Sequence, residues 1–212
     1  MVACEKDHHH QKALPMDDLN EQAVEHIFRE AGAVLEGHFL LTSGRHSPAY
    51  WEKFQVLQWP QHTERLCRAL ADHFRPANVE VVVGPTTGGI ILAYEVARQL
   101  GVRGVFVEND PDRPGQRALR RGFQVHSGEH VLIVDDVLTA GTSIREVLAA
   151  LTPFQPEIVG IGVLIDRSNG QADFGVPLHA LLHLTVPSYA PADCPLCAEG
   201  QPLVKPGSRK SA

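Results

Sequence analysis

Apolar runs and amphipathic segments alternate along the middle of the chain. Runs rich in Val and Ile predict four buried strands, at residues 79–83, 103–107, 131–134 and 158–165. Apolar positions at helical spacing predict helices at residues 60–74, 88–101 and 142–151. Strands that are apolar on both faces and alternate with helices are typical of a parallel sheet covered on both sides. We therefore predict an α/β fold in which ligands bind at the carboxyl ends of the strands.

The segment that precedes this sheet predicts one helix and a short extended pair. Apolar residues recur at helical spacing after Asp17, with Asp17 or Asp18 as the N-cap and Gly32 at the C-terminal end. Two extended segments follow, around residues 39–41 and 49–51, and a turn that contains Ser, Gly and Pro joins them. Nothing in the chain length demands a second core, so we interpret these elements as additions to one α/β domain.

Two segments carry too little apolar character to predict a packed structure. Residues 1–15 mix charge, a proline and the histidines His8, His9 and His10, which predicts a mobile, solvated tail in preference to a metal-chelating one. Residues 108–123 are rich in Pro, Gly, Asp and Arg, and we expect a flexible loop or ribbon over the ligand-binding edge of the sheet.

Composition narrows the class of protein. Of the 212 residues, 43% are hydrophobic and 21% are charged, as in ordinary soluble proteins, and the net charge of −6 argues against general attraction to nucleic acid. No apolar run reaches the roughly 20 residues that a membrane helix needs. The first residues also lack the apolar stretch of a signal peptide. We expect a cytoplasmic protein with no nucleic-acid or membrane partner.

The number and spacing of the cysteines bear on the redox compartment and on a candidate zinc site. Four cysteines in a chain of this length do not make a disulfide framework, which agrees with a reducing compartment. Cys194 and Cys197 have the spacing of half a zinc site, and His179 and His183 are the nearest candidates for the other two ligands. The alternative is a reduced, structural turn without metal.

The segment from Val131 to Ser143 carries the strongest chemical signal. Its apolar strand ends in two adjacent carboxylates, Asp135 and Asp136, and a small, hydroxyl-rich loop then opens a helix. Free backbone amides at the helix start, together with Thr and Ser hydroxyls, can surround a phosphate, and Gly141 lets the backbone come close. Carboxylates beside that phosphate can accept hydrogen bonds from the vicinal hydroxyls of a ribose. The alternative is a tight turn whose aspartates only cap the helix.

Residues 131–143 resemble the phosphoribosyl pyrophosphate (PRPP) signature of the type I phosphoribosyltransferases. Competing phosphate motifs are absent from the sequence, because no Lys-Ser or Lys-Thr follows the glycines of residues 84–89 and no GxGxxG follows a strand. The resemblance implies Mg²⁺-dependent transfer of a phosphoribosyl group to a nitrogen base with release of pyrophosphate, the metal being held mainly through PRPP. It also implies that Asp135 and Asp136 hold the ribose hydroxyls and act in catalysis. In the family a short loop after the first core strand binds pyrophosphate, and residues 85–89 stand in that place here. The implied PRPP contacts are Thr86, Thr87, Gly88, Asp135, Asp136, Val137, Leu138, Thr139, Ala140, Gly141, Thr142 and Ser143.

A second resemblance narrows the family to the orotate phosphoribosyltransferases. Residues 37–48 resemble the hood motif of those enzymes, and Asp166-Arg167 after the last core strand matches them as well. Orotate carries a carboxylate that purines lack, which suits a guanidinium such as that of Arg167, and Tyr50 or Trp51 could stack on the ring. The implied orotate contacts are Thr42, Ser43, Arg45, Tyr50, Thr139 and Arg167.

The resemblance covers residues 17–209, including a Cys-rich tail like that of one bacterial branch, and it has two departures. Thr42 stands where the family usually has a lysine, and residues 108–123 lack the usual Lys-x-x-Lys-x-His run. Arginines can neutralise pyrophosphate as lysines do, and we predict the catalytic role for Arg117. The loop candidates are Arg113, Gln116, Arg117, Arg120 and Arg121. In the family this loop closes over the neighbouring subunit's site, which implies a homodimer.

The resemblance also implies a domain organisation and a reaction. Residues 1–16 form a mobile tail and residues 17–212 one phosphoribosyltransferase domain, divided into hood elements and lead-in (17–59), core (60–170), and a C-terminal hood strand and tail (171–212). The implied product is orotidine 5′-phosphate, in UMP and pyrimidine biosynthesis. Two rival functions stay open: a transferase for another base, such as a purine or uracil, and a non-catalytic regulator that senses PRPP.

Overall fold

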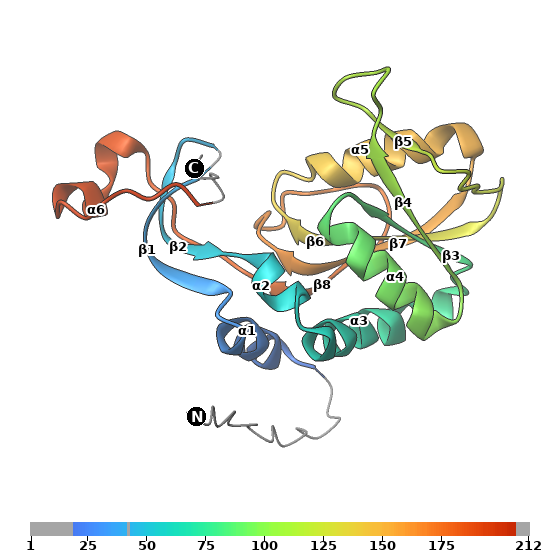
Figure 1. The fold of residues 1–212 in the computed structure, drawn as a ribbon, viewed down its shortest axis with the longest axis horizontal. Coiled ribbons are helices and arrows are strands. Elements are labelled where there is room, and N and C mark those ends of the chain that lie inside the picture. The colour runs from blue at the N-terminus through green and yellow to red at the C-terminus, as the bar shows by residue number, and fades with distance from the viewer. Residues whose placement is uncertain (1–18, 42, 207–212) are drawn as a thin grey trace, which may run out of the picture.

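The computed structural model describes residues 19–41 and 43–206 (Figure 1). The predicted tail, the cap candidates Asp17 and Asp18, and the predicted orotate contact Thr42 lie outside the described residues. The helices are α1 (Glu21–Glu30), α2 (Lys53–Leu57), α3 (Pro60–Phe74), α4 (Gly88–Leu100), α5 (Thr142–Leu151) and α6 (Pro195–Ala198), with 3₁₀ turns at Arg75–Ala77, Thr152–Phe154 and Pro191–Asp193. The strands are β1 (Val34–Leu40), β2 (His46–Trp51), β3 (Val81–Pro85), β4 (Arg103–Asn109), β5 (Arg117–Leu119), β6 (His130–Leu138), β7 (Glu157–Asp166) and β8 (Leu178–His183).

A six-stranded sheet forms the core, in the strand order β5-β4-β3-β6-β7-β8. All neighbouring strands are parallel except β5, which pairs antiparallel with β4. Helices α1 to α4 pack on one face, and α5 covers the other (Figure 1). Alternate residues of a strand serve the two faces, because Val82 and Leu132 pack towards α3 and α4 while Val81 and Ile133 pack towards α5. The predicted α/β fold with a parallel sheet is confirmed.

The clearest sequence patterns predicted the central helices closely. Helix α5 has the predicted bounds, α3 begins at the predicted Pro60, and α4 ends at the predicted Gly101, whose φ is +75°. The predicted N-cap of α1 was wrong. Asn20 caps this helix, because its side chain accepts a hydrogen bond from the backbone amide of Ala23.

Two segments join the core sheet in ways that the sequence did not specify. Within residues 171–212, strand β8 belongs to the core, because it pairs with β7 and buries Leu181 and Leu182 there, whereas residues 189 and 204 bridge to β2 and β1. Residues 108–123 contain a hairpin, in which β4 continues to Asn109 and pairs with β5. Of the two expectations for this segment, a flexible loop or a ribbon, the structure shows the ribbon.

A two-stranded antiparallel sheet, β1 and β2, stands beside the core (Figure 1). The chain returns to this sheet after β8, where backbone hydrogen bonds join Val204 to His38 and Tyr189 to His46. We call β1, β2 and residues 188–206 the hood. The pairing of β1 with β2 confirms the predicted extended pair. The hood also contains a C-terminal segment that is distant from this pair in sequence.

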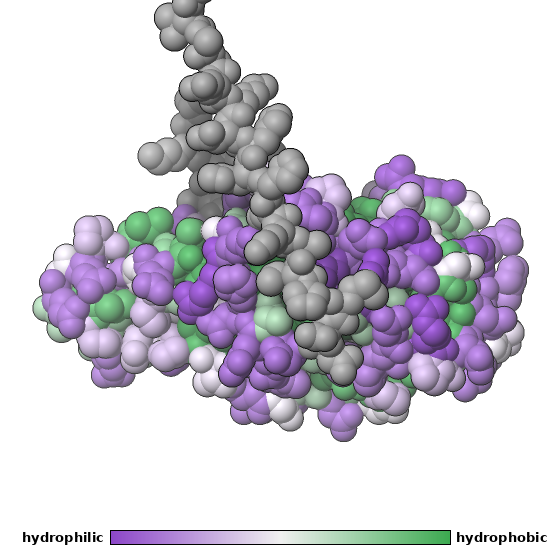
Figure 2. Space-filling model, turned by 90° about the horizontal axis from the view of Figure 1, so that it is seen from below, coloured by the Kyte–Doolittle hydropathy of each residue, from purple (hydrophilic) through white to green (hydrophobic). Residues whose placement is uncertain are grey.

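The molecular face in Figure 2 is mostly hydrophilic, with hydrophobic side chains scattered among polar ones. The exposed large apolar side chains belong to several elements: Leu35, Phe54, Trp59, Tyr94, Leu203 and Val204. Within residues 19–41 and 43–206, no helix is both long enough and apolar enough to cross a membrane.

Gly160 of β7 allows α3 to pack directly on the sheet. A Cβ atom at this position would lie 2.4 Å from the ring of Phe74, whereas one at Gly162 would lie 3.2 Å from the same ring. We expect Gly160→Ala to lower the free energy of unfolding by about 1–3 kcal/mol, and by more than Gly162→Ala, in urea denaturation. Trimming the ring with Phe74→Leu should remove most of this penalty in a double-mutant cycle. Additive single effects would contradict the packing argument.

Candidate active site

Two adjacent carboxylates are buried where β6 ends. Asp135 is 5% exposed and Asp136 is 3% exposed. Ser143 Oγ donates a hydrogen bond of 2.6 Å to Asp135 Oδ2, and Lys53 Nζ donates one of 2.8 Å to Asp136 Oδ1. Backbone amides complete the arrangement, since that of Asp136 donates to Asp135 Oδ1 and that of Val137 donates to Asp136 Oδ1. The predicted pair is therefore held by one cation, one hydroxyl and two amides.

The loop after β3 lies directly against this pair. A Cβ atom on Gly88 would sit 1.9 Å from Asp136 Oδ2, so a residue with a side chain would displace either the loop or the carboxylate. Thr87 is exposed and Thr86 is half-buried. The structure thus brings the predicted pyrophosphate loop and the acid pair together.

Helix α5 begins beside the pair. Its N-cap, Gly141, has a φ of +76° and no side-chain hydrogen bond caps the helix, which leaves the first amides of α5 available to a ligand. The exposed residues around this helix start are Thr139, Ala140 and Thr142. Ser143 is bonded to Asp135. Val137 and Leu138 turn their side chains into the two core clusters, so only their backbone can contact a ligand.

Two of the predicted base contacts, Tyr50 and Arg167, lie together. Arg167 follows β7, and its backbone amide donates to Leu138 O at 2.8 Å, which fixes it beside the end of β6. Burial lowers the pKa of Arg167, and the charge interaction with Tyr50 acts in the opposite direction. Burial also raises the pKa of Tyr50. Trp51, the alternative stacking residue, is instead buried in the core against Phe28, with ring centroids 5.4 Å apart.

Two further predicted base contacts, Ser43 and Arg45, lie on the exposed turn between β1 and β2, while Thr139 lies before the start of α5. Arg45 Nε donates to Ser188 Oγ at 2.9 Å, and its Nη2 donates to Ser188 O. These bonds stay within the hood. Among the described residues, Arg45 makes no hydrogen bond to the acid pair or to Arg167, and its predicted role in orotate binding stays a prediction.

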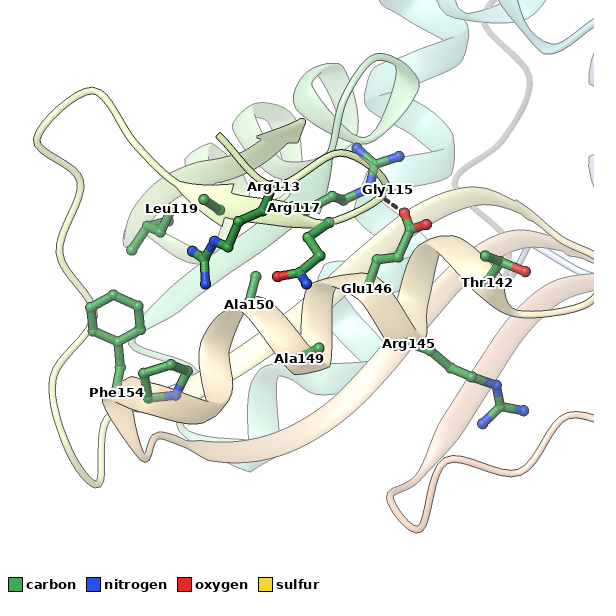
Figure 3. Close-up of a pocket in the computed structure, with 13 residues that line it drawn as sticks. Arg113, Gly115, Arg117, Leu119, Thr142, Arg145, Glu146, Ala149, Ala150 and Phe154 are labelled. Atoms are coloured by element: carbon green, nitrogen blue, oxygen red, sulfur yellow. Dashed lines mark hydrogen bonds and ion pairs between the residues drawn. The ribbon is translucent and has the colours of Figure 1, made fainter. Parts of the chain in front are cut away.

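Arg117 of β5 reaches back to the predicted pyrophosphate loop. Its Nη1 donates to Thr86 Oγ1 at 2.9 Å, and its Nε donates to Glu146 Oε2 of α5 at 2.7 Å (Figure 3). The side chain is 13% exposed, so this cation is partly shielded from water. The structure therefore brings the predicted catalytic arginine to the same loop that meets the acid pair.

A cavity of about 540 Å³ separates the hairpin from α5 (Figure 3). Arg113, Arg117 and Arg145 line it, together with apolar residues near the C-terminal end of α5. Of the residues assigned to catalysis or PRPP binding, only Arg117 and Thr142 line this cavity, so it lies between the hairpin and α5 and does not reach the acid pair. The remaining loop candidates are exposed: Arg113, Gln116, Arg120 and Arg121.

Comparisons with known proteins agree with this geometry. Residues 54–173 match the family described as phosphoribosyl transferase domain. The chain is 54% identical over 184 residues to the orotate phosphoribosyltransferase of Pelotomaculum thermopropionicum, which covers 87% of this chain and 95% of that one. It is 50% identical over 192 residues to the same enzyme of Desulforamulus reducens, with 91% and 99% covered.

This chain belongs to the orotate phosphoribosyltransferase family. The crystal structure of orotate phosphoribosyltransferase from Aeropyrum pernix is similar in fold, with a TM-score of 0.65 at 27% identity over 76% of this chain and 93% of that one.

Lys53 is a site residue of this phosphoribosyltransferase that the sequence patterns did not reveal. It lies on α2, a helix of five residues. Its side chain is 35% exposed, and the Asp136 carboxylate that it contacts is 4% exposed. One signal in the sequence could have found it, because Lys53 is the single lysine between Lys12 and Lys205. A cation at this place partly neutralises the buried acid pair.

The acid pair also changes the protonation of its members. Burial raises the pKa of Asp135 to about 6, repulsion from Asp136 adds to the rise, and the hydrogen bond from Ser143 opposes it. The ordinary value is 3.8, so the folded state holds this proton more tightly than the unfolded chain does. The contribution of Asp135 to stability is therefore complete below about pH 3.8 and is lost as the pH rises through about 6.

We expect Asp135→Asn to unfold several degrees above the wild type at pH 8, because the variant removes a buried negative charge. The difference should shrink as the pH falls below about 6. Thermal unfolding scans across this range measure both effects. Asp173→Asn, at an exposed residue, is the matched control for the exchange of a carboxylate for an amide. The same pH dependence in the wild type and Asp135→Asn would exclude the raised pKa.

Proposed function

We propose that this protein transfers the phosphoribosyl group of PRPP to orotate, forming orotidine 5′-phosphate and releasing pyrophosphate in de novo UMP biosynthesis. The observation that carries the proposal is the buried Asp135–Asp136 pair, enclosed by the glycine loop at Gly88 and by the uncapped start of α5. The names of the relatives at 50% and 54% identity support the same reaction.

Each part of PRPP has a complementary part of the site. The first amides of α5, with the hydroxyls of Thr139 and Thr142, suit the 5-phosphate. The carboxylates of Asp135 and Asp136 suit the ribose hydroxyls, which are hydrogen-bond donors. The loop after β3, with Arg117 bonded to it, suits the pyrophosphate.

We further propose that Mg²⁺ takes part and is held mainly through PRPP. The carboxylate oxygens of Asp135 and Asp136 are hard donors, which fits this ion. Asp136 is already bonded to Lys53, and Asp135 to Ser143, so we assign most of the coordination to the diphosphate and ribose oxygens. When bound, Mg²⁺ supplies positive charge that stabilises the leaving pyrophosphate.

The protein's own residues act by position and charge. Positive charge develops on the sugar as the bond between its C1 and the pyrophosphate loosens, and Asp135 and Asp136 stabilise it. Arg117 stabilises the negative charge on the departing pyrophosphate. A ring nitrogen of orotate then forms the new bond to C1, and its proton passes to the departing pyrophosphate or to water.

Arg167 and Tyr50 are our candidates for orotate binding. The partly buried guanidinium of Arg167 can donate two parallel hydrogen bonds to a carboxylate, which favours the anionic base over a purine or uracil. Tyr50 lies close enough to interact with Arg167, and its ring can pack against the pyrimidine. Arg167 stands at the same edge of the sheet as the acid pair, because its backbone amide is bonded to Leu138.

A direct assay tests the reaction. When the protein is mixed with PRPP, Mg²⁺ and orotate, the absorbance of orotate should fall and an equimolar amount of pyrophosphate should be released. Asp136→Asn should lower turnover about 100-fold or more. The unfolding midpoint of Asp136→Asn should stay close to that of the wild type, which separates loss of turnover from loss of folding. Asp173→Asn should keep wild-type turnover. Turnover with a purine or uracil in place of orotate would support the rival transferase. Calorimetric uptake of PRPP without turnover of any base would support the sensing regulator.

We also propose a cytoplasmic homodimer in which residues 108–123 of one subunit serve the site of its neighbour. The exposed arginines of this hairpin and the cavity between it and α5 support an exchange. Arg117 contacts Thr86 of its own chain in the described conformation. An exchange therefore requires the hairpin to swing outward. The charged substrates, which do not cross membranes unaided, fit a cytoplasmic location.

Mixing two inactive variants tests the exchange. Arg117→Ala and Asp136→Asn leave different parts of the site intact, so a hybrid dimer with exchanged hairpins has one complete site. Random subunit exchange should then restore about a quarter of wild-type turnover, because half of the dimers are hybrids and each has one complete site of two. Turnover equal to the average of the two separate variants would show that Arg117 acts within its own chain. A monomer with full activity in sizing experiments would contradict the dimer.

A further inference from the structure

Two histidines and two cysteines meet inside the hood. His38 lies on β1, His46 on β2, and Cys194 and Cys197 at the start and within the turn of α6. One potential ligand atom from each of the four residues lies within 4.8 Å of the three others. The β1–β2 pair and a C-terminal segment that is distant from it in sequence thus bring four metal-binding side chains to one place.

The histidines that the sequence suggested as partners of the cysteines are the wrong ones. His179 stacks on His73, with ring centroids 3.6 Å apart, and His183 Nδ1 lies 2.7 Å from Glu21 Oε1. Both histidines belong to β8 of the core sheet, whereas the cysteines belong to the hood. The hood supplies its own pair of imidazoles.

The distances in the cluster fit a tetrahedral metal site. Cys194 Sγ lies 3.5 Å from His38 Nε2, and Cys197 Sγ lies 3.7 Å from the same nitrogen and 3.3 Å from His46 Nδ1. With Zn–S near 2.3 Å and Zn–N near 2.0 Å, neighbouring ligand atoms of a tetrahedron are roughly 3.3–3.8 Å apart. The two ring nitrogens lie 2.9 Å apart and need to separate only slightly.

The ring of His38 already has the orientation that a metal requires. Its Nδ1 lies 2.8 Å from the carbonyl oxygen of Gln201 and donates a proton to it, which leaves the Nε2 lone pair facing the cluster. His38 is 3% exposed, and His46 and Cys194 are each 4% exposed. Cys197 is exposed, so three of the four residues are buried and the fourth is reachable from solvent.

The hood has little apolar core of its own to hold it together. Trp51 of β2 packs into the main core, and the other buried apolar residues among the described part of the hood are Phe39 and Cys194. The returning segment is joined to β1 and β2 through isolated bridges at Val204 and Tyr189. A small module with so little apolar burial gains much of its stability from a bound metal.

We propose that His38 Nε2, His46 Nδ1 and the thiolates of Cys194 and Cys197 bind one Zn²⁺, which clamps the C-terminal segment onto β1 and β2. The two thiols release their protons when the metal binds. Four protein ligands leave no open position, so the role of the ion is structural. Thiolate ligands select zinc over Mg²⁺, so this metal site is distinct from the Mg²⁺ proposed for the phosphoribosyl transfer.

Metal analysis of the purified full-length protein tests the proposal. The wild type should hold about one zinc per chain, and Co²⁺ in its place should give thiolate-to-cobalt charge-transfer bands with tetrahedral ligand-field bands. The double variant Cys194→Ser, Cys197→Ser should lose about 90% or more of both signals. Cys67→Ala, at a buried cysteine of α3, is the matched control and should keep them. The histidines of residues 8–10 are present in every variant, so metal bound there does not change.

Chelation gives a second readout. Removal of zinc should lower the Tm of the wild type by about 4 °C or more and leave that of the double variant unchanged. If the double variant fails to fold, titration of metal-free wild type with zinc or cobalt decides the question alone. Folded wild type that takes up neither ion, or a cobalt spectrum without thiolate bands, would overturn the proposal.

Discussion

The burial of two adjacent carboxylates at the end of β6 is the constraint on which the site depends. Successive side chains of a strand point to opposite faces, so Asp135 turns towards α5 and Asp136 towards α4. The hydrogen bonds follow this division, since Ser143 of α5 serves Asp135 while Lys53 and the Gly88 loop meet Asp136. Two charges in one buried place are costly unless cations and donors surround them. The pair therefore determines what the loops on both faces of the sheet must supply.

The parallel sheet is what allows those loops to meet. Strands β3 and β6 are neighbours in register, with Val83 opposite Ile133, so their carboxyl ends reach the same edge. The loop after β3 then approaches the acid pair so closely that Gly88 has no room for a side chain, and Gly84 has none beside Gly89. Backbone groups can line the site because side chains are absent from these positions.

Local patterns made the core of this site predictable. The thirteen residues from Val131 to Ser143 contain a strand, both acids, the turn and the helix start, so one continuous stretch of sequence specified them together. Lys53 lies 83 residues from Asp136, on a helix of five residues that has too few turns to show a periodic pattern. The cluster of two histidines and two cysteines in the hood is still harder to predict from sequence, because Cys194 lies 156 residues from His38. Contacts of this kind depend on how the elements dock, which no local pattern encodes.

The docking of the hood also bears on the choice of base. Strand β2 carries His46 near one end and Tyr50 near the other, and Trp51 after it is anchored in the main core against Phe28. With His46 fixed among the hood residues, both ends of β2 are held, and so is Tyr50, which lies near enough to Arg167 to interact with its charge. The core thus supplies the part of the site proposed to bind PRPP, and the hood supplies part of the site proposed to bind orotate. An interaction that shifts β2 should accordingly change orotate binding more than PRPP binding, because the acid pair and the start of α5 belong to the core sheet and its helices.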